Sequence, residues 1–348
     1  MRIILLLLMI LGSTGLYLKF NLPDNNGKVT RWDMPTAYSD SNYQTQNAKK
    51  FAEKVYQCTN GELDIVIHGS GSLFKGHEIR RVVQTGQAAI GERLLSSHAN
   101  ENPLFAFDSI PFIATGFDQS NALWAAAKEP LKQVMDQEHL VLLYSVPWPP
   151  QGLYFKTAVT SKTDMQRSKF RAYNNATARI AELAGMVPIQ IEAAELSQAL
   201  ALGVVESLIS SGSTGYDRKV WEHLDYYYDL KAWLPRSYVF ANKELFQALS
   251  QHNQDCVMSS AAYAEQTGTN RAQELTQWYV DQLAENGMKV SEAGPQLKAE
   301  LREIGNVLTK EWTDAMGPAG EAILSDYRTR LASEQPTTLK LMIGELKE

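Results

Sequence analysis

The chain has 348 residues, about twice the length of an average domain, and its 44% hydrophobic content is enough for two folded cores. It carries 33 Lys and Arg against 39 Asp and Glu, a formal net charge of −6, which argues against a general nucleic-acid-binding protein. Ordinary counts of Gly (22) and Pro (13) exclude fibrous and low-complexity classes.

The N-terminus has the pattern of a secretory signal. An apolar run over residues 3–11 follows Met1 and Arg2 and precedes four small residues, 12–15. This run is shorter than the ~20 residues of a membrane-spanning helix, but it suits the hydrophobic region of a signal peptide. We expect residues 1–15 to be a signal peptide cleaved after Gly15; an uncleaved anchor lengthened by residues 16–18 is the alternative.

Strands and helices are predicted to alternate through the first part of the chain. Strand patterns lie at residues 29–34, 63–68, 87–90 and 140–146, and helical patterns lie at residues 44–57 and 78–85. The first helix places one set of residues on a common apolar face: Ala48, Phe51, Ala52, Val55 and Tyr56. The Trp-Pro-Pro-Gln-Gly segment at residues 148–152 then marks the strongest break in the chain.

A second α/β run follows this break. Strands are predicted at residues 169–172, 188–191, 204–210 and 233–241, helices at 175–185 and 195–202, and a small polar loop at 210–215. From residue 243 to about 332 the pattern is almost wholly helical. These elements predict an α/β fold of two lobes, with a ligand cleft between the lobes at the C-terminal ends of strands.

Neither cysteines nor histidines have the spacing of a metal site. Cys58 and Cys256 lie far apart; a disulfide is possible in an oxidising compartment, but two unrelated buried thiols are the favoured interpretation. The six histidines are scattered, and the sequence lacks a nucleophile elbow, a P-loop and a dinucleotide-binding motif. We therefore expect no cofactor, no metal and no enzymatic activity.

Arg171 is the first candidate for ligand binding. It ends a short strand, and a guanidinium there can pair with a carboxylate through two parallel hydrogen bonds. A helix beginning near Asn175 would add backbone amides for the same anion. Ser210 and Ser211, in the hydroxyl-rich loop after another strand, are a second place where donors could meet an anion. The alternative for Arg171 is a surface ion pair.

Several separated motifs resemble one family of binding proteins. The motifs are residues 32–38 leading into 50–55, residues 71–75 with Glu78, residues 107–114, Lys-Phe-Arg at 169–171, residues 184–189, residues 195–206, and Asn-Lys at 242–243. From Trp32 to about Leu331 the chain resembles the DctP-type solute-binding proteins of tripartite ATP-independent periplasmic (TRAP) transporters. Arg171 falls on the arginine that pairs with the ligand carboxylate in that family.

The resemblance implies an organisation and a set of partners. The fold would be a two-lobed periplasmic-binding-protein-like fold with a long helix crossing both lobes. Lobe I would take residues 28–148 plus 236–278, lobe II residues 149–235 plus 279–331, and residues 332–348 would form a C-terminal tail. The protein would be a monomer in the periplasm of a Gram-negative bacterium. It would deliver a small-molecule carboxylate to the small and large TRAP membrane subunits.

The sequence departs from the family pattern near the start of lobe II. A second family arginine has no counterpart in residues 151–156, which disfavours dicarboxylates and sialic-acid-like ligands. Trp148, Gln151 and Tyr154 would instead form an aromatic, moderately polar wall that suits a monocarboxylate such as a 2-oxo, 2-hydroxy or aromatic acid.

Three further contacts are predicted on weaker grounds: Tyr38, Glu92 and Asn242. For each of them a purely structural role is an equal alternative. For the whole chain, the alternative functions are a sensor, an ABC-type binding protein or, less favoured, an exported α/β enzyme.

Overall fold

The computed structural model describes residues 29–334, and the predicted signal peptide lies outside this range. Eleven strands lie in this range: β1 (Thr30–Pro35), β2 (Leu63–His68), β3 (Ile90–Leu94), β4 (Leu140–Pro147), β5 (Gln151–Phe155), β6 (Lys169–Ala172), β7 (Val187–Gln190), β8 (Ser207–Ser211), β9 (Tyr226–Tyr228), β10 (Arg236–Asn242) and β11 (Lys289–Ser291). Eleven α-helices accompany them: α1 (Tyr43–Cys58), α2 (Ile79–Gln84), α3 (Phe117–Gln137), α4 (Lys162–Met165), α5 (Asn175–Leu183), α6 (Leu196–Ala201), α7 (Gly212–Asp217), α8 (Lys243–Gln247), α9 (Gln251–Glu285), α10 (Pro295–Met316) and α11 (Pro318–Glu334).

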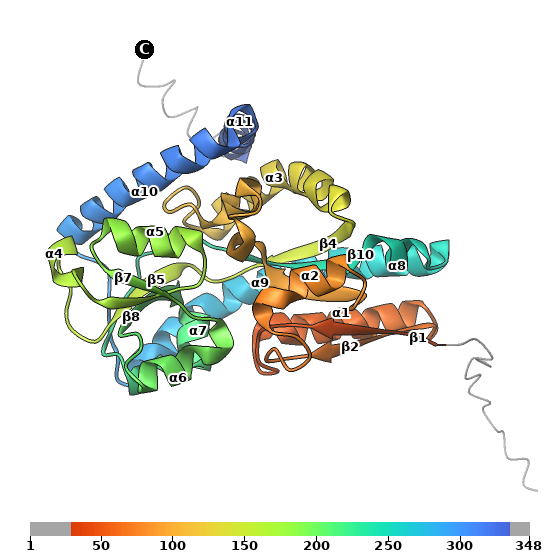
Figure 1. The fold of residues 1–348 in the computed structure, drawn as a ribbon, viewed down its shortest axis with the longest axis horizontal. Coiled ribbons are helices and arrows are strands. Elements are labelled where there is room, and N and C mark those ends of the chain that lie inside the picture. Colours follow the sequence, from red (N-terminus) through yellow and green to blue (C-terminus); the bar gives the residue numbers. More distant parts are fainter. Residues whose placement is uncertain (1–28, 335–348) are drawn as a thin grey trace, which may run out of the picture.

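The strands form three sheets in two lobes (Figure 1). Lobe I contains the parallel pair β1-β2 and the antiparallel sheet β3-β10-β4, while lobe II contains the mixed six-stranded sheet β11-β9-β5-β8-β6-β7. The predicted two-lobed α/β class is thereby confirmed. Of the strands, β5, β9 and β11 are additions to the predicted set.

The chain passes between the lobes three times before β11, and after β11 α10 packs against α5 in lobe II while α11 packs against α3 in lobe I. Two of the crossings are extended segments that lie side by side: the backbone N–H of Trp148 donates to the carbonyl of Pro235 (2.7 Å), and that of Gln151 donates to Trp233 (2.9 Å). The third is α9, which packs against α1 and β4 in lobe I and against α7 and β11 in lobe II. The expected long inter-lobe helix is thus present. The boundaries drawn at residues 278/279 and 331/332 fall inside α9 and α11 and stay predictions.

Helix α1 illustrates how the pattern becomes structure. Its cap is Asn42, whose side-chain oxygen accepts from the backbone N–H of Gln44 (2.9 Å), and its apolar face is buried at Phe51 and Val55. Tyr56 differs from the prediction, since it is 49% exposed. Its ring lies beside the turn at Gly61, outside the core, because it sits at the edge of the apolar stripe.

The cysteine prediction is wrong. Cys58, the last residue of α1, is joined to Cys256 in α9 by a disulfide, with the two Cα atoms 5.6 Å apart. The two residues are 198 positions apart in the sequence. The side-by-side packing of α1 and α9 brings them within the distance that a disulfide requires, and no local pattern could indicate that packing.

A second correction concerns the polar segment 210–215, which was expected to be a loop. Ser210 and Ser211 end β8, and Gly212 begins α7. The hydroxyl of Ser211 accepts from the backbone N–H of Thr214 (3.3 Å), which is the capping interaction that starts this helix. In residues 29–334, no helix combines the length and the apolar character that crossing a membrane would require.

Candidate functional site

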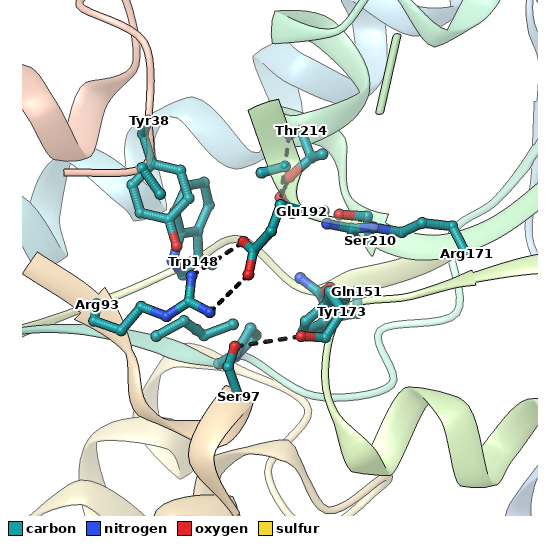
Figure 2. Close-up of a pocket in the computed structure, with 15 residues that line it drawn as sticks. Tyr38, Arg93, Ser97, Trp148, Gln151, Arg171, Tyr173, Glu192, Ser210 and Thr214 are labelled. Carbon is teal, nitrogen blue, oxygen red and sulfur yellow. Dashed lines mark hydrogen bonds and ion pairs between the residues drawn. The ribbon is translucent and has the colours of Figure 1, made fainter. Parts of the chain in front are cut away.

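A cavity of about 50 Å³ lies between the lobes, beside the two extended crossings. Lobe II contributes Gln151 from β5, Arg171 from β6, Tyr173, Glu192, Ala193, Ser210 and Ser211 from β8, and Thr214 from α7. Lobe I contributes Arg93 and Leu94 from β3, together with three residues outside strands: Ala37, Tyr38 and Ser97. Trp148 and Pro235 come from the crossings. Figure 2 shows these side chains converging on one space. Residues from distant parts of the sequence therefore share one site.

Arg171 presents an unpaired positive charge to this cavity. Its side chain is buried, its Nε donates to the backbone carbonyl of Ile191 (3.0 Å), and its guanidinium lies 4.8 Å from the centre of the Tyr173 ring. No described residue accepts a hydrogen bond from its two terminal nitrogens. Burial lowers the pKa of Arg171 to about 10, so the group is still cationic at neutral pH. The arrangement leaves a guanidinium fork available to an anion.

The second charged feature is an ion pair that joins the lobes. The terminal nitrogens of Arg93, in lobe I, donate to both carboxylate oxygens of Glu192, in lobe II, over 2.9 and 3.1 Å (Figure 2). Burial alone would raise the pKa of Glu192, but the bonds to Arg93 and the charge of Arg171 outweigh it and hold that pKa below its usual value. Glu192 is therefore ionised. The charges lining the cavity are two arginines and one carboxylate, a net charge of +1.

Uncharged side chains fix the rest of the wall. The hydroxyl of Tyr173 donates to Gln151 Oε1 (3.1 Å), and Gln151 Nε2 donates to the carbonyl of Pro149 (3.2 Å). The indole N–H of Trp148 donates to Ser237 Oγ (3.1 Å), and the ring of Tyr38 meets the ring of Trp148 edge-on at 4.7 Å. These hydrogen bonds and the ring contact fix the orientation of the uncharged side chains in the wall.

Six of the ten predicted site residues line this cavity: Tyr38, Trp148, Gln151, Arg171, Ser210 and Ser211. Arg171 and the serines do so because β6 and β8 are neighbours in the sheet. Trp148 and Gln151 do so because the break at residues 148–152 is the point at which the chain crosses between the lobes.

The other four predicted residues lie elsewhere, and in two of them the pleat of a strand is the reason. Tyr154 is three residues from Gln151 in β5 and so points to the opposite face, where its hydroxyl donates to the carbonyl of Ser211 (2.9 Å). Glu92 is adjacent to Arg93 in β3 and also points away; it accepts from Thr36 Oγ1 (2.7 Å).

Asn242 and Asn175 lie at helix ends outside the cavity. Asn242 caps α8 by accepting from the N–H of Leu245 (3.0 Å), and it donates to the carbonyl of Val83 (3.0 Å). Asn175 begins α5 and lines a separate groove that also contains Arg179 and Trp312. The helix that was expected to present its N-terminus to the ligand is capped instead by Asn174, whose side chain accepts from the N–H of Thr177 (2.9 Å).

Sequence reasoning missed the inter-lobe pair and several neutral lining residues. Arg93 lies in a strand and Glu192 just after one, so the sequence could have indicated both as candidate site residues. The sequence could not indicate that they form an ion pair, because they are 99 residues apart and belong to different lobes. Tyr173, which follows Arg171 by two residues, was not predicted to line the site. No group of three or more potential metal ligands lies within residues 29–334.

Comparisons with known proteins agree with this geometry. The sequence profile of DctP, described as bacterial extracellular solute-binding protein, family 7, matches residues 34–315. The ectoine/5-hydroxyectoine-binding periplasmic protein UehA of Ruegeria pomeroyi is 22% identical over 313 residues, which cover 82% of this chain and 86% of UehA.

Two solved structures are more similar in sequence. A TRAP solute-binding protein from a marine metagenome, specific for pyroglutamate and solved with co-purified pyroglutamate, is 50% identical with a TM-score of 0.86; the match covers 87% of this chain and 100% of that one. DctP6 of Bordetella pertussis, an extracytoplasmic solute receptor that binds pyroglutamic acid, is 42% identical with a TM-score of 0.85, over 86% and 100% of the two chains.

The family match covers most of the chain, and the two-lobed fold with its buried arginine in the cleft agrees with it. The protein belongs to family 7 of the bacterial extracellular solute-binding proteins, the DctP-type solute receptors of TRAP transporters.

Proposed function

We propose that this protein captures pyroglutamate, a five-membered cyclic amide with one carboxylate, in the periplasm and delivers it to small and large TRAP membrane subunits. It does so as a monomeric binding protein without catalysis. The predicted monocarboxylate class includes this ligand, and the 2-oxo, 2-hydroxy and aromatic acids of the same class are its competitors. Two relatives that bind pyroglutamate, at 50% and 42% identity, support the choice of this ligand.

The observation that carries the proposal is the buried guanidinium of Arg171, whose terminal nitrogens donate to no described residue. In the low dielectric of a closed cleft, such a cation favours an anion with a matching pair of acceptors. The lining has a net charge of +1, so one carboxylate neutralises it and a second would be left without a partner.

The cavity is narrow, which favours a small ring over a longer ligand. A water molecule needs about 10–15 Å³ of comparable space, so a cavity of about 50 Å³ has room for only a few water-sized groups, and even the nine heavy atoms of pyroglutamate require its walls to move apart. A sugar acid, with its longer chain of hydroxyl groups, would need a wider cleft and more hydrogen-bonding partners. The edge-on pair of Tyr38 and Trp148 gives an apolar wall against which the ring methylenes of pyroglutamate can pack.

The test is a binding screen on protein freed of co-purified ligand by unfolding and refolding. Thermal shift is measured with pyroglutamate, proline, glutamate, orotate, glucuronate, ectoine and several 2-oxo and aromatic acids, and calorimetry follows for each hit. We expect pyroglutamate to raise the melting temperature most, since ligand at 100 times its Kd stabilises the folded state by about 2.7 kcal/mol.

Two outcomes would contradict the proposal. If glutamate or a sugar acid binds more tightly than pyroglutamate, the ligand assignment is wrong. If none of the compounds binds, although the refolded protein unfolds cooperatively, and mass spectrometry of the extract from the purified protein finds a different small molecule, that molecule replaces pyroglutamate.

A further inference from the structure

Glu192 is the one carboxylate among the described residues that line the cavity. Arg93 engages each of its oxygens once, and no other described side chain or backbone group donates to them. An ionised carboxylate accepts about four hydrogen bonds, so acceptor positions are left free. The side chain is 25% exposed, and Figure 2 places it between Arg93 and Arg171, inside the cavity.

This position imposes a condition on any anionic ligand. A carboxylate paired with Arg171 comes close to a second negative charge, that of Glu192. Repulsion is relieved if the ligand places an N–H donor next to its carboxylate, directed at Glu192. If the ligand instead presents a methylene group or a lone pair there, the free acceptor positions of a desolvated carboxylate stay unpaired, which costs binding energy.

We propose that Glu192 determines specificity by accepting a hydrogen bond from the ring N–H of the ligand, and that Arg93 is the positioning residue that directs it. The proposal rests on the proposed function, because in pyroglutamate the ring nitrogen is bonded to the carbon that carries the carboxylate. Arg171 then binds the carboxylate while Glu192 selects the amide beside it. The ligand class is a cyclic amide or amine with an adjacent carboxylate.

Arg93 makes this selection depend on closure. Arg93 belongs to lobe I and Glu192 to lobe II, so the carboxylate has its final orientation only when the lobes meet. A ligand that donates to Glu192 stabilises the same arrangement that the ion pair requires. A ligand that cannot donate leaves the closed state less favourable, and only such a difference between states shifts the equilibrium.

The experiment compares pyroglutamate with its carbocyclic isostere, 3-oxocyclopentane-1-carboxylate, in which a methylene replaces the ring N–H. Both have the same charge, nearly the same shape and a carbonyl at the same ring position, but the ketone of the isostere is a weaker acceptor than the lactam carbonyl. The change in the affinity ratio between the wild type and Glu192→Gln therefore isolates the part of the difference that Glu192 contributes through the N–H. In the wild-type protein we expect the isostere to bind at least about 100-fold more weakly, because sites built around a hydrogen bond reject analogues that lack the group.

Two variants separate the recognition of the ring N–H by Glu192 from the closure of the lobes. In Glu192→Gln, the guanidinium of Arg93 attracts the amide oxygen, so an NH₂ group faces the ligand; we expect the ratio of the two affinities to fall below about tenfold. In Arg93→Met, both affinities fall together and most of the ratio is kept, since the charge of Glu192 is still present. The ratio cancels any general loss of closure or stability that a variant causes.

The wild-type measurement alone can overturn the inference. If both compounds bind within threefold of each other, no acceptor in the site recognises the ring N–H. If the ratio is large but unchanged in a folded Glu192→Gln protein, another acceptor such as Gln151 Oε1 takes the hydrogen bond from the N–H. Either result leaves pyroglutamate capture intact, whereas absence of pyroglutamate binding in the wild type contradicts the proposed function itself.

Discussion

The two walls of the cleft are built differently. On the lobe II wall, Arg171 and Gln151 are held by their own lobe or by a crossing: Arg171 by Ile191, and Gln151 by Tyr173 and Pro149. On the lobe I wall, polar groups reach across the cleft. Arg93 bonds to Glu192, and Ser97 Oγ donates to the carbonyl of Tyr173 (3.3 Å). Arg171 and Gln151 are therefore held without lobe I, whereas the bonds that Arg93 and Ser97 make to lobe II form only when the lobes meet.

The same contrast extends beyond the cavity. Asn42 Nδ2, in lobe I, donates to Asp217 Oδ2 of lobe II (2.6 Å), and Asn174 Nδ2, in lobe II, donates to Ser96 Oγ (3.0 Å). None of these four residues lines the cavity. Under the proposed function, Arg171 of lobe II would hold the ligand carboxylate, and these inter-lobe bonds would stabilise the closed arrangement.

The largest effect is expected from the loss of Arg171. Arg171→Ala removes the only partner that we assign to the ligand carboxylate, so binding should weaken by about 2–5 kcal/mol because a buried carboxylate is left unpaired. Calorimetry with pyroglutamate measures the loss, and thermal unfolding without ligand tests whether the fold survives.

Arg171→Lys is the matched control for that change. It keeps the charge but loses the fork and the stacking on Tyr173, so its affinity should lie between those of the wild type and the alanine variant. Wild-type affinity in Arg171→Ala would show that the carboxylate binds elsewhere, with Arg93 as the next candidate.

Next in size is removal of the disulfide, which should affect stability and leave recognition intact. Replacing both Cys58 and Cys256 by serine frees a loop of 198 residues, and unfolding should become easier by about 2–5 kcal/mol. Urea titration measures this, with the dithiothreitol-reduced wild type as the comparison. The affinity for ligand should change less than threefold, since the bond joins α1 and α9 and does not line the cavity. A large loss of affinity at unchanged stability would instead link the disulfide to closure.

Loss of the inter-lobe hydrogen bond between Asn42 and Asp217 should have a smaller and more selective effect. Asp217→Ala removes the acceptor of Asn42 Nδ2, so the closed state should lose about 1–3 kcal/mol. We expect faster ligand release in stopped-flow measurements, with association and thermal unfolding nearly unchanged. Slower association with normal release would mean that this contact acts before closure.

The smallest effect concerns pH and the buried face of lobe I. Burial raises the pKa of Glu92 to about 7, with the bond from Thr36 opposing the shift. Glu92 therefore favours the protonated form in the folded state. Its contribution to stability is complete below its unfolded pKa, near 4.5, and is lost as the pH rises through about 7.

Melting temperature should accordingly fall by about 2–4 °C between pH 6 and pH 8, and Glu92→Gln should flatten this fall. Asp108 is buried too, and its pKa is raised to about 6, so its own contribution is lost mainly below this window. A fall that persists unchanged in Glu92→Gln would assign the pH dependence to another group.

Local patterns were enough to predict many elements and part of the site. The strands 63–68 and 169–172 have the predicted bounds, because each is a short apolar or alternating run between turn residues. Arg171 was identifiable from its place at a strand end and from the family resemblance. Short edge strands such as β9 and β11 were missed, since three residues carry too little periodicity to be recognised.

What the sequence by itself determined is the α/β class, the two-lobed organisation and the family, because each follows from composition, periodicity or motifs within short segments. The signal peptide at residues 1–15 and the ligand contact at Arg171 rest on the same kind of local pattern and stay predictions. Only the tertiary structure decided which face each strand residue presents, that Cys58 meets Cys256, and that Arg93 meets Glu192. Those pairs join segments 198 and 99 residues apart, and their formation depends on how helices and lobes pack, which no local pattern of side chains specifies.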